Sequence, residues 1–345
     1  MKKLRVLALM HEDLVPPADS SGYTDEEIAP WKMEYDVTAT LEILGHEVQS
    51  VGVSSDLKVL GDAILDWKPH LTFNLLEEFH SIPAYDQHVV GFLELMRQPY
   101  TGCNPRGLLL SRDKPLCKKI LSYHRVPTPG FVVFPIGRAI RRPRRLEFPL
   151  LVKSATDHAS LGITEESIVH SDDALVKRVR YVHETIGSDA LVEEYIAGRE
   201  FYVGVLGNTR LQTFPIWELR FDNLPEGFPN IATARVKWDS EHQKKLGIST
   251  DVARDLPPGV EQQVVRLCKR IYRVLNLSGY ARLDFRLSEE GKLYVLEANP
   301  NPNLSYGEDF AESAETMGID YPNLLQRIVR LGLNYTAPWR LSMAS

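Results

Sequence analysis

The amino-acid sequence predicts an open parallel α/β sheet in the first third of the chain, followed by mixed α+β structure. Strand-like and helix-like segments alternate over about the first 110 residues, which is typical of parallel sheets built from βαβ units. Strand patterns follow one another in the last third of the chain instead. The length of 345 residues also exceeds the usual size of one domain, so we expect two or three.

The N-terminal elements follow from apolar runs and their spacing. Residues 4–10 are expected to form a buried strand, and a polar, proline-containing loop follows it. Met33, Val37, Leu41 and Leu44 recur at helical spacing, which predicts a helix that ends at Gly45. Further strands are expected at 46–53 and 71–75, and further helices at 57–67 and 86–97.

A second unit is expected to begin near Ser111, and the Pro- and Gly-containing segment 126–130 marks a break within it. Ser171 is expected to cap a helix. Strands are predicted at 131–134, 150–153, 190–196, 200–206, 211–218, 280–287 and 293–298, and helices at 113–124, 260–275 and 322–331.

Composition limits the classes of function. Lysine and arginine number 40 against 46 acidic residues, which gives a formal net charge of −6. A general binder of nucleic acid or anionic membrane needs a basic surface, so we expect neither partner. The three cysteines show no CxxC spacing, which argues against a disulfide framework and favours a reducing cytosol. The N-terminus faintly resembles a signal peptide, but a first strand is the better interpretation, and we expect a cytoplasmic protein.

The segment 279–300 contains the strongest chemical signal. It predicts a hairpin in which Ser288 pairs with Leu293, so that Asp284 faces Glu297 and Arg282 faces Asn299. Directly opposed carboxylates repel unless a proton or a cation lies between them. Two carboxylates and an amide oxygen suit Mg²⁺. The alternative is a hairpin with an ordinary solvated polar face.

Two lysines are candidates for binding an anion such as a phosphate. Lys153 ends a buried apolar run, where an unpaired charge would be costly. Lys114 opens a predicted helix, whose N-terminus attracts anions, although a surface lysine is an equal alternative. The small, polar segment 154–163 reads as a loop that could close over phosphates with Ser160, or as an ordinary loop.

Taken together, these segments resemble the ATP-grasp enzymes, and among them the D-alanine–D-alanine ligases. The resemblance runs from about residue 84 to residue 332 and rests on the order and spacing of its motifs. The motifs are Asp113-Lys114, Leu151-Val152-Lys153, Glu193-Glu194-Tyr195-Ile196, Glu200, Lys237, Arg282-x-Asp284 and Glu297-Ala298-Asn299.

The resemblance implies an ATP-grasp fold in which two α+β subdomains hold ATP between them. Lys114 and Lys153 would bind the α- and β-phosphates, and Lys237 would close on the γ-phosphate. Arg282 would stabilise the transferring phosphoryl group. The adenine would lie against Glu193, Glu194, Tyr195 and Ile196, the ribose against Glu200, and two Mg²⁺ ions, with Mn²⁺ as a substitute, on Asp284, Glu297 and Asn299.

The amino-acid half of the site departs from the family pattern. Glu12 is a candidate to replace the family's glutamate after the first strand. Asn303 stands where the family has a glycine, and it could donate its backbone N–H if it adopts a glycine-like conformation; Ser305 follows in the same loop. The arginines of residues 138–145 could bind an acidic substrate or peptide, and a solvated loop is the favoured alternative.

The resemblance implies a ligase that joins a carboxylate to an amine through an acyl phosphate, with amino-acid or short-peptide substrates. A phosphotransferase that stops at a phosphorylated product and a nucleotide sensor without turnover are the alternatives. Relatives are often dimers, so a homodimer is an expectation by analogy. We expect units at 1–110 (N-terminal α/β), 111–190 (central) and 191–345 (C-terminal, catalytic).

Overall fold

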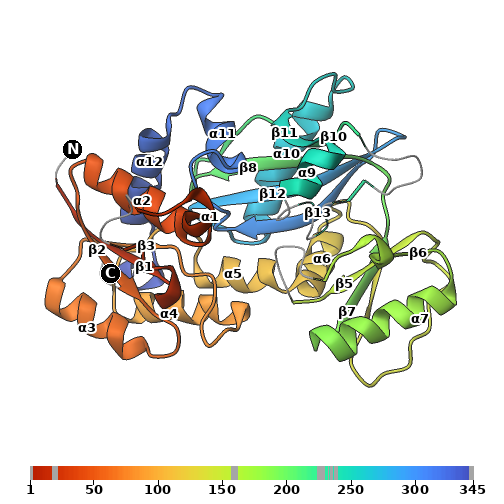
Figure 1. Ribbon diagram of the computed structural model, residues 1–345, viewed down its shortest axis with the longest axis horizontal. Coiled ribbons are helices and arrows are strands. Elements are labelled where there is room, and N and C mark those ends of the chain that lie inside the picture. Colours follow the sequence, from red (N-terminus) through yellow and green to blue (C-terminus); the bar gives the residue numbers. More distant parts are fainter. Residues whose placement is uncertain are drawn as a thin grey trace.

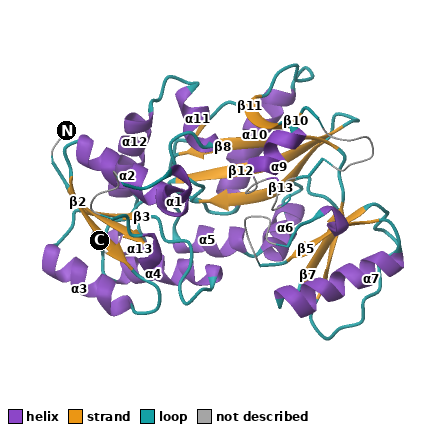
Figure 2. Cartoon of the chain, in the orientation of Figure 1, coloured by secondary structure: helices purple, strands orange, loops and turns teal. Residues whose placement is uncertain are grey.

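The computed structural model describes residues 3–17, 22–156, 162–223, 230–231, 233, 236 and 240–341. Three sheets organise these residues (Figure 1). Red and orange segments of the chain form the first sheet, yellow and green segments the second, and green to blue segments the third. Figure 2 shows the same arrangement by secondary structure.

The first sheet is parallel, as predicted. Its strands are β1 (Arg5–Met10), β2 (Glu47–Gly52) and β3 (Leu71–Asn74), in the order β2-β1-β3. Both faces are covered, because Val6, Ala8 and Met10 point into one core cluster and Leu7 and Leu9 into another. Burial on both faces explains why the sequence of β1 is a continuous run of apolar residues rather than an alternation of apolar and polar residues.

Helices cover the two faces of this sheet (Figure 1). On one face lies α2 (Lys32–Ile43), whose buried residues are Glu34, Val37 and Leu41. The C-terminal helix α12 (Tyr321–Asn334) returns to the same face and contacts β3 and α2. The helices α3 (Leu57–Trp67) and α4 (Asp86–Leu95) contribute to the core on the other face.

The second sheet is antiparallel and has the order β4-β7-β5-β6. Helix α7 contacts β5 and β6, and it begins after Ser171, whose Oγ accepts the N–H of Ala174 at 3.2 Å. The predicted cap is therefore confirmed. The elements are β4 (Phe131–Phe134), β5 (Leu150–Ser154), β6 (Ile168–Val169), α7 (Asp172–Tyr181) and β7 (Ala190–Glu194), with α5 (Pro105–Arg112) and α6 (Lys114–Tyr123) preceding them.

The third sheet has six strands in the order β11-β10-β8-β12-β13, and β9 pairs with β8. The single strand predicted at 211–218 is wrong, because the structure divides it into β9 and β10 around Pro215. Proline lacks the N–H that a strand ladder needs. The strands are β8 (Gly198–Leu206), β9 (Gln212–Thr213), β10 (Trp217–Phe221), β11 (Ile248–Val252), β12 (Tyr280–Ser288) and β13 (Leu293–Pro300), and α10 (Val260–Val274) contacts β13.

Short elements complete the described chain. The remaining α-helices are α1 (Asp25–Ile28), α9 (Ser240–Leu246), α11 (Asp309–Glu315) and α13 (Pro338–Leu341), and single turns lie at Glu12–Leu14, Ala29–Trp31, Pro83–Tyr85, Glu165–Ser167 and Val182–Ile186. None of the helices in this part of the chain combines the length and apolar character that crossing a membrane requires.

The hairpin β12–β13 has the predicted register at one end and a different register at the other. Asp284 faces Glu297 and Arg282 faces Asn299, as expected. Near the turn, however, Leu293 pairs with Leu287 rather than with Ser288, because a bulge follows Asp284. Bulges are common beside functional sites, where they redirect a side chain.

Candidate active site

The face of the β12–β13 hairpin carries a compact polar cluster. Asp284 is buried, and the Arg282 guanidinium donates to both of its oxygens, at 2.9 and 3.0 Å. Asn299 Nδ2 donates to Asp284 Oδ2 at 2.9 Å. Burial alone would lower the pKa of Arg282, but the neighbouring Asp284 carboxylate outweighs that effect and raises it, so this arginine stays charged.

The donor groups of this cluster fit a hard divalent cation. Asp284 and Glu297 face each other across the strand pair, and Asn299 adds an amide oxygen on the same face. The amide nitrogen of Asn299 is the end that contacts Asp284, so its oxygen is directed elsewhere. Within the described ranges, no group of three His, Cys, Asp or Glu side chains could hold a metal, and here the third donor is an asparagine.

A second cluster joins two buried lysines to one glutamate. Glu193 Oε1 lies 2.7 Å from Lys153 Nζ, and Glu193 Oε2 lies 2.8 Å from Lys118 Nζ. Burial would raise the pKa of Glu193, yet the two ammonium groups outweigh it and hold that pKa below its usual value. Burial lowers the pKa of Lys118 despite this pairing. Glu193 therefore stays ionised, and it fixes Lys153 through its carboxylate.

The local sequence explains how the lysines reach this position. Asp113 caps α6 by accepting the Leu116 N–H at 2.8 Å, so Lys114 stands at the start of the helix. Lys118 follows one turn later on the same face. Lys114 Nζ lies 3.1 Å from Glu297 Oε1, and this contact links the lysines to the hairpin cluster. Lys118 was not predicted, although its four-residue spacing from Lys114 was a readable signal.

In the segment expected to bind adenine and ribose, neighbouring side chains contact different parts of the structure. Glu194 Oε2 accepts the N–H of Gly130 at 3.0 Å, whereas Glu193 faces the lysines. The Tyr195 hydroxyl contacts the carbonyl of Asn230 at 3.4 Å, and Ile196 is half-buried. The structure thus brings Glu193 to the lysines and leaves Glu194 beside the loop 126–130, which precedes β4.

Glu200 is buried and fully engaged by its neighbours. It accepts the hydroxyl of Tyr202 at 3.0 Å and lies 3.0 Å from the guanidinium of Arg286. Arg286 is buried too, and it also donates to the carbonyls of Gly198 and Asn230. Arg286 was not identified as a site residue, although it alternates with Arg282 and Asp284 along β12.

The residues predicted for the amino-acid half lie in two separate places. Glu12 Oε1 accepts the Ser54 hydroxyl at 2.7 Å, beside the end of β2. Asn303 and Ser305 lie together after β13, where Asn303 Oδ1 accepts both the N–H and the hydroxyl of Ser305, each at 2.8 Å. The glycine-like conformation considered for Asn303 is found at Asn301 instead, with φ of 51°.

The expectations for Ser160, for Lys237 and for the arginines of residues 138–145 remain to be compared with the structure. Ser160 and Lys237 lie outside the described residues. Within the basic run, Arg142 pairs with Asp172 at 2.8 Å and stacks over the Phe148 ring at 4.5 Å. These contacts give Arg142 a structural role in the second unit.

A parallel α/β sheet, two further antiparallel sheets with their helices, and a cluster of lysines beside opposed carboxylates define an ATP-grasp enzyme. A family model described as D-ala D-ala ligase C-terminus matches residues 134–330, more than half of the chain. The chain belongs to the D-alanine–D-alanine ligase family, and it is an ATP-dependent, ADP-forming ligase that joins a carboxylate to an amine.

Individual relatives support this assignment. The chain is 30% identical to the D-alanine–D-alanine ligase of Desulfotalea psychrophila over 74% of its length and 76% of that protein. It is 30% identical to the D-alanine–D-alanine ligase of Desulforudis audaxviator over 86% of its length and 90% of that protein. The solved D-alanine–D-alanine ligase of Bacillus anthracis in complex with ATP has the same fold, with a TM-score of 0.73, 24% identity and 99% coverage of both chains.

Proposed function

We propose that the protein uses ATP and Mg²⁺ to join an amino acid or short peptide, through its carboxylate, to an amine. The observation that carries this proposal is the contact of Lys114 with Glu297, which joins the lysine cluster to the opposed carboxylates. The two relatives described above are named D-alanine–D-alanine ligases, which supports a ligase rather than a phosphotransferase or a nucleotide sensor.

The proposed reaction has two steps. A carboxylate oxygen of the first substrate attacks the γ-phosphorus of ATP, ADP leaves, and an acyl phosphate forms. The amine of the second substrate then attacks the acyl carbon, phosphate leaves, and the amine loses a proton as the amide forms. The chain contributes positioning and charge neutralisation more than covalent chemistry.

Each cluster has a role in this scheme. Lys114 and Lys153 bind the α- and β-phosphates, and Glu193 holds Lys153 in place from the adenine side. Arg282 stabilises charge on the transferring phosphoryl group. Asp284, Glu297 and Asn299 would hold two Mg²⁺ ions, with Mn²⁺ as a substitute, and the bound metal would neutralise the triphosphate. Glu194, Tyr195, Ile196 and Glu200 line the nucleoside, Ser160 and Lys237 cover the phosphates, and Glu12, Asn303 and Ser305 serve the amino substrates.

We also propose the division of the chain into units at 1–110, 111–190 and 191–345. Small-molecule substrates, a cytoplasmic location and a homodimer stay predictions of the sequence.

A substrate screen with a site variant tests the proposal. Incubation with ATP, Mg²⁺ and pairs of amino acids and short peptides is expected to release phosphate and yield an amide. Glu297→Gln removes one carboxylate and is expected to lower turnover by about 10²–10³-fold, since such electrostatic contacts carry that much of the rate. Glu290→Gln, in the exposed turn of the same hairpin, is the matched control and should keep full activity.

Two results would contradict the proposal. A stable phosphorylated product in place of an amide, identified by mass spectrometry, would indicate a phosphotransferase. Near-normal turnover of Glu297→Gln would show that the metal assignment is wrong.

A further inference from the structure

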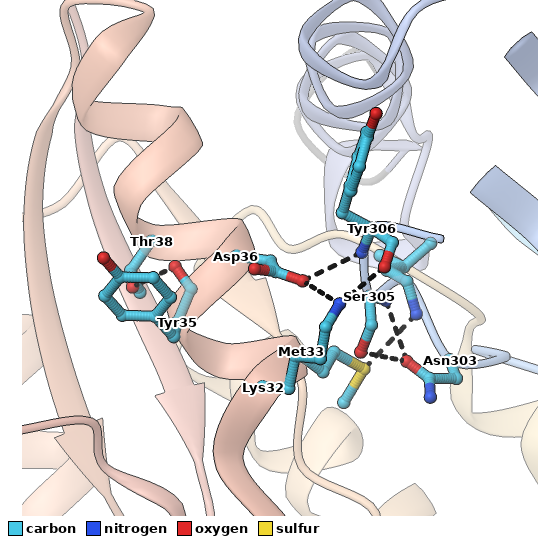
Figure 3. Close-up of polar contacts among 9 residues, drawn as sticks. Lys32, Met33, Tyr35, Asp36, Thr38, Asn303, Ser305 and Tyr306 are labelled. Carbon is cyan, nitrogen blue, oxygen red and sulfur yellow. Dashed lines mark hydrogen bonds and ion pairs between the residues drawn. The ribbon is translucent and has the colours of Figure 1, made fainter. Parts of the chain in front are cut away.

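Two side chains of helix α2 form hydrogen bonds with the backbone of the loop that follows β13 (Figure 3). Lys32 Nζ donates to the carbonyl of Tyr306 at 2.5 Å, and Asp36 Oδ2 accepts the N–H of Tyr306 at 2.9 Å. The two side chains pair with each other at 2.8 Å, one helical turn apart. One ion pair therefore holds both backbone polar groups of a single loop residue.

Further contacts join α2 to the loop and order the loop internally. The N–H of Leu304 points at Met33 Sδ of α2, 3.4 Å away. Asn303 Oδ1 is held by two donors from Ser305, so the Nδ2 end of its amide is directed away from Ser305 (Figure 3). Among the described residues, Asn303 Nδ2 makes no hydrogen bond, and the side chain is exposed. The turn thus presents an oriented amide donor.

This loop lies between two groups of the candidate site. It begins just after Asn299 and ends at α11, where Asp309 Oδ2 lies 4.0 Å from Arg282 Nη1. A shift of the loop would therefore move its polar groups relative to the hairpin cluster. The segment has no regular secondary structure of its own to resist such a shift.

We propose that Lys32 and Asp36 are positioning residues that fix the Asn303–Ser305 turn at the amino-substrate end of the site. The inference rests on the proposed function and adds a residue pair from the first unit to it. The ammonium and carboxylate act on the loop backbone and do not contact the reacting groups.

The relative size of the effects on stability and on substrate binding distinguishes a positioning role from a purely structural one. A partly exposed ion pair and its two hydrogen bonds to the backbone make only a small contribution to the stability of the whole chain. Loss of the pair should thus leave the protein folded. A displaced turn should instead weaken binding of the amino substrate, an effect that its KM measures and that a loss of stability alone would not produce.

The test uses Lys32→Met and Asp36→Ala in the full chain, with Lys32→Arg as the conservative variant that keeps the donor. The control is Lys58→Met, because Lys58 and Asp62 form an exposed pair of the same spacing on α3. Hydrogen–deuterium exchange over residues 301–308 measures the loop without any substrate. ATP titration and the KM values for ATP and for the amino substrates measure the site.

We expect exchange in 301–308 and the KM for amino substrate to rise by about 10-fold in Lys32→Met and Asp36→Ala, which matches the loss of about 1.4 kcal/mol of contacts. ATP affinity should stay within about 2-fold, since no described contact joins the pair to the lysine cluster. Lys32→Arg should behave as the wild type, and so should Lys58→Met.

Unchanged exchange in 301–308 would overturn the proposal, because the pair would then not hold the loop. Faster exchange with an unchanged KM for the amino substrate would also overturn it. A substrate screen without any product would contradict the proposed function instead, and the exchange measurement would still decide whether Lys32 and Asp36 hold the loop.

Discussion

A cluster of buried charged side chains lies between α6 and β7, and removal of a single charged group is expected to have its largest effect on the site here. Lys118 and Lys153 share the carboxylate of Glu193, and all three side chains are at least nine-tenths buried. Breaking a buried pair by removing one partner leaves an uncompensated charge and typically costs about 3–5 kcal/mol. Lys118 should therefore govern the position of Lys153 without touching the nucleotide.

Lys118→Met tests this arrangement. With only Lys153 as partner, Glu193 is expected to draw Lys153 away from the phosphates, so ATP affinity should fall by about 10-fold, or about 1.4 kcal/mol. ATP titration by calorimetry measures the loss, and thermal unfolding measures the accompanying destabilisation. Lys119→Met removes an exposed neighbouring lysine and should change neither quantity. An unchanged ATP affinity in Lys118→Met would show that Glu193 holds Lys153 alone.

Glu34 is a second buried charge, on the core-facing side of α2. The side chain is 1% exposed, and its Oε1 has no hydrogen-bond partner among the described residues. Burial is the main cause that raises the pKa of Glu34 from 4.5 to about 7. The unfolded chain therefore ionises this group at lower pH than the folded chain does, and stability is lost as pH rises from 4.5 to about 7.

Glu34→Gln should remove this pH dependence. At about 1.4 kcal/mol per pH unit, the variant is expected to be more stable than the wild type by up to about 3 kcal/mol at pH 8, and equally stable near pH 4. Urea unfolding at several pH values measures the difference. Glu42→Gln, at an exposed position of the same helix, should show no such trend. Parallel pH profiles for wild type and Glu34→Gln would disprove the assignment.

At the scale of elements, local pattern was enough to predict most helices and strands but not their irregularities. The pairing of Asp284 with Glu297 could be predicted, because alternation fixes which side chains share a face. The bulge could be found only from burial: Leu293, Val295 and Ala298 are all buried, and a spacing of two followed by three breaks a regular alternation. Strict alternation therefore misplaced the turn end of the hairpin.

Contacts between distant elements account for what the sequence could not predict. Lys118 lies on a helix that was predicted, but its partner Glu193 lies on β7, far from it in the sequence. Likewise, the hydrogen bonds between α2 and Tyr306 join two segments that are far apart in the sequence, and no local sequence pattern indicates that they meet. Such contacts depend on tertiary packing, which a periodicity of two or 3.6 residues does not encode.

At the scale of the whole molecule, the net charge of −6 conceals a local arrangement. Lys114, Lys118 and Lys153 gather in one place, where they form ion pairs with the carboxylates of Glu193 and Glu297. A negative net charge disfavours a polyanion such as nucleic acid as partner, whereas we expect the phosphates of ATP to meet the ammonium groups of Lys114 and Lys153 together. A negative net charge therefore argues against a general polyanion binder and is still compatible with a local site for a small phosphate-bearing ligand.

The C-terminal helix α12 completes the core of the N-terminal sheet, which bears on where the first unit ends. Leu324, Leu325, Ile328 and Val329 are buried in the same cluster as β1 and β3. Complete burial of four such side chains contributes about 6–12 kcal/mol, which is comparable to the whole stability of a typical domain. The segment 1–110 thus contains the first sheet but lacks part of the core that covers it.

A fragment of residues 1–110 is therefore expected not to fold cooperatively on its own. It should bind a hydrophobic dye and lack a sharp thermal transition by circular dichroism, because without α12 only α2 covers one face of its sheet. Adding residues 319–341, joined to the fragment by a flexible linker, should restore a cooperative transition. The matched control is the same fusion with Leu325→Asp and Ile328→Asp, which places charges on the buried face of α12. Cooperative unfolding of 1–110 alone would show that the first unit is complete without α12.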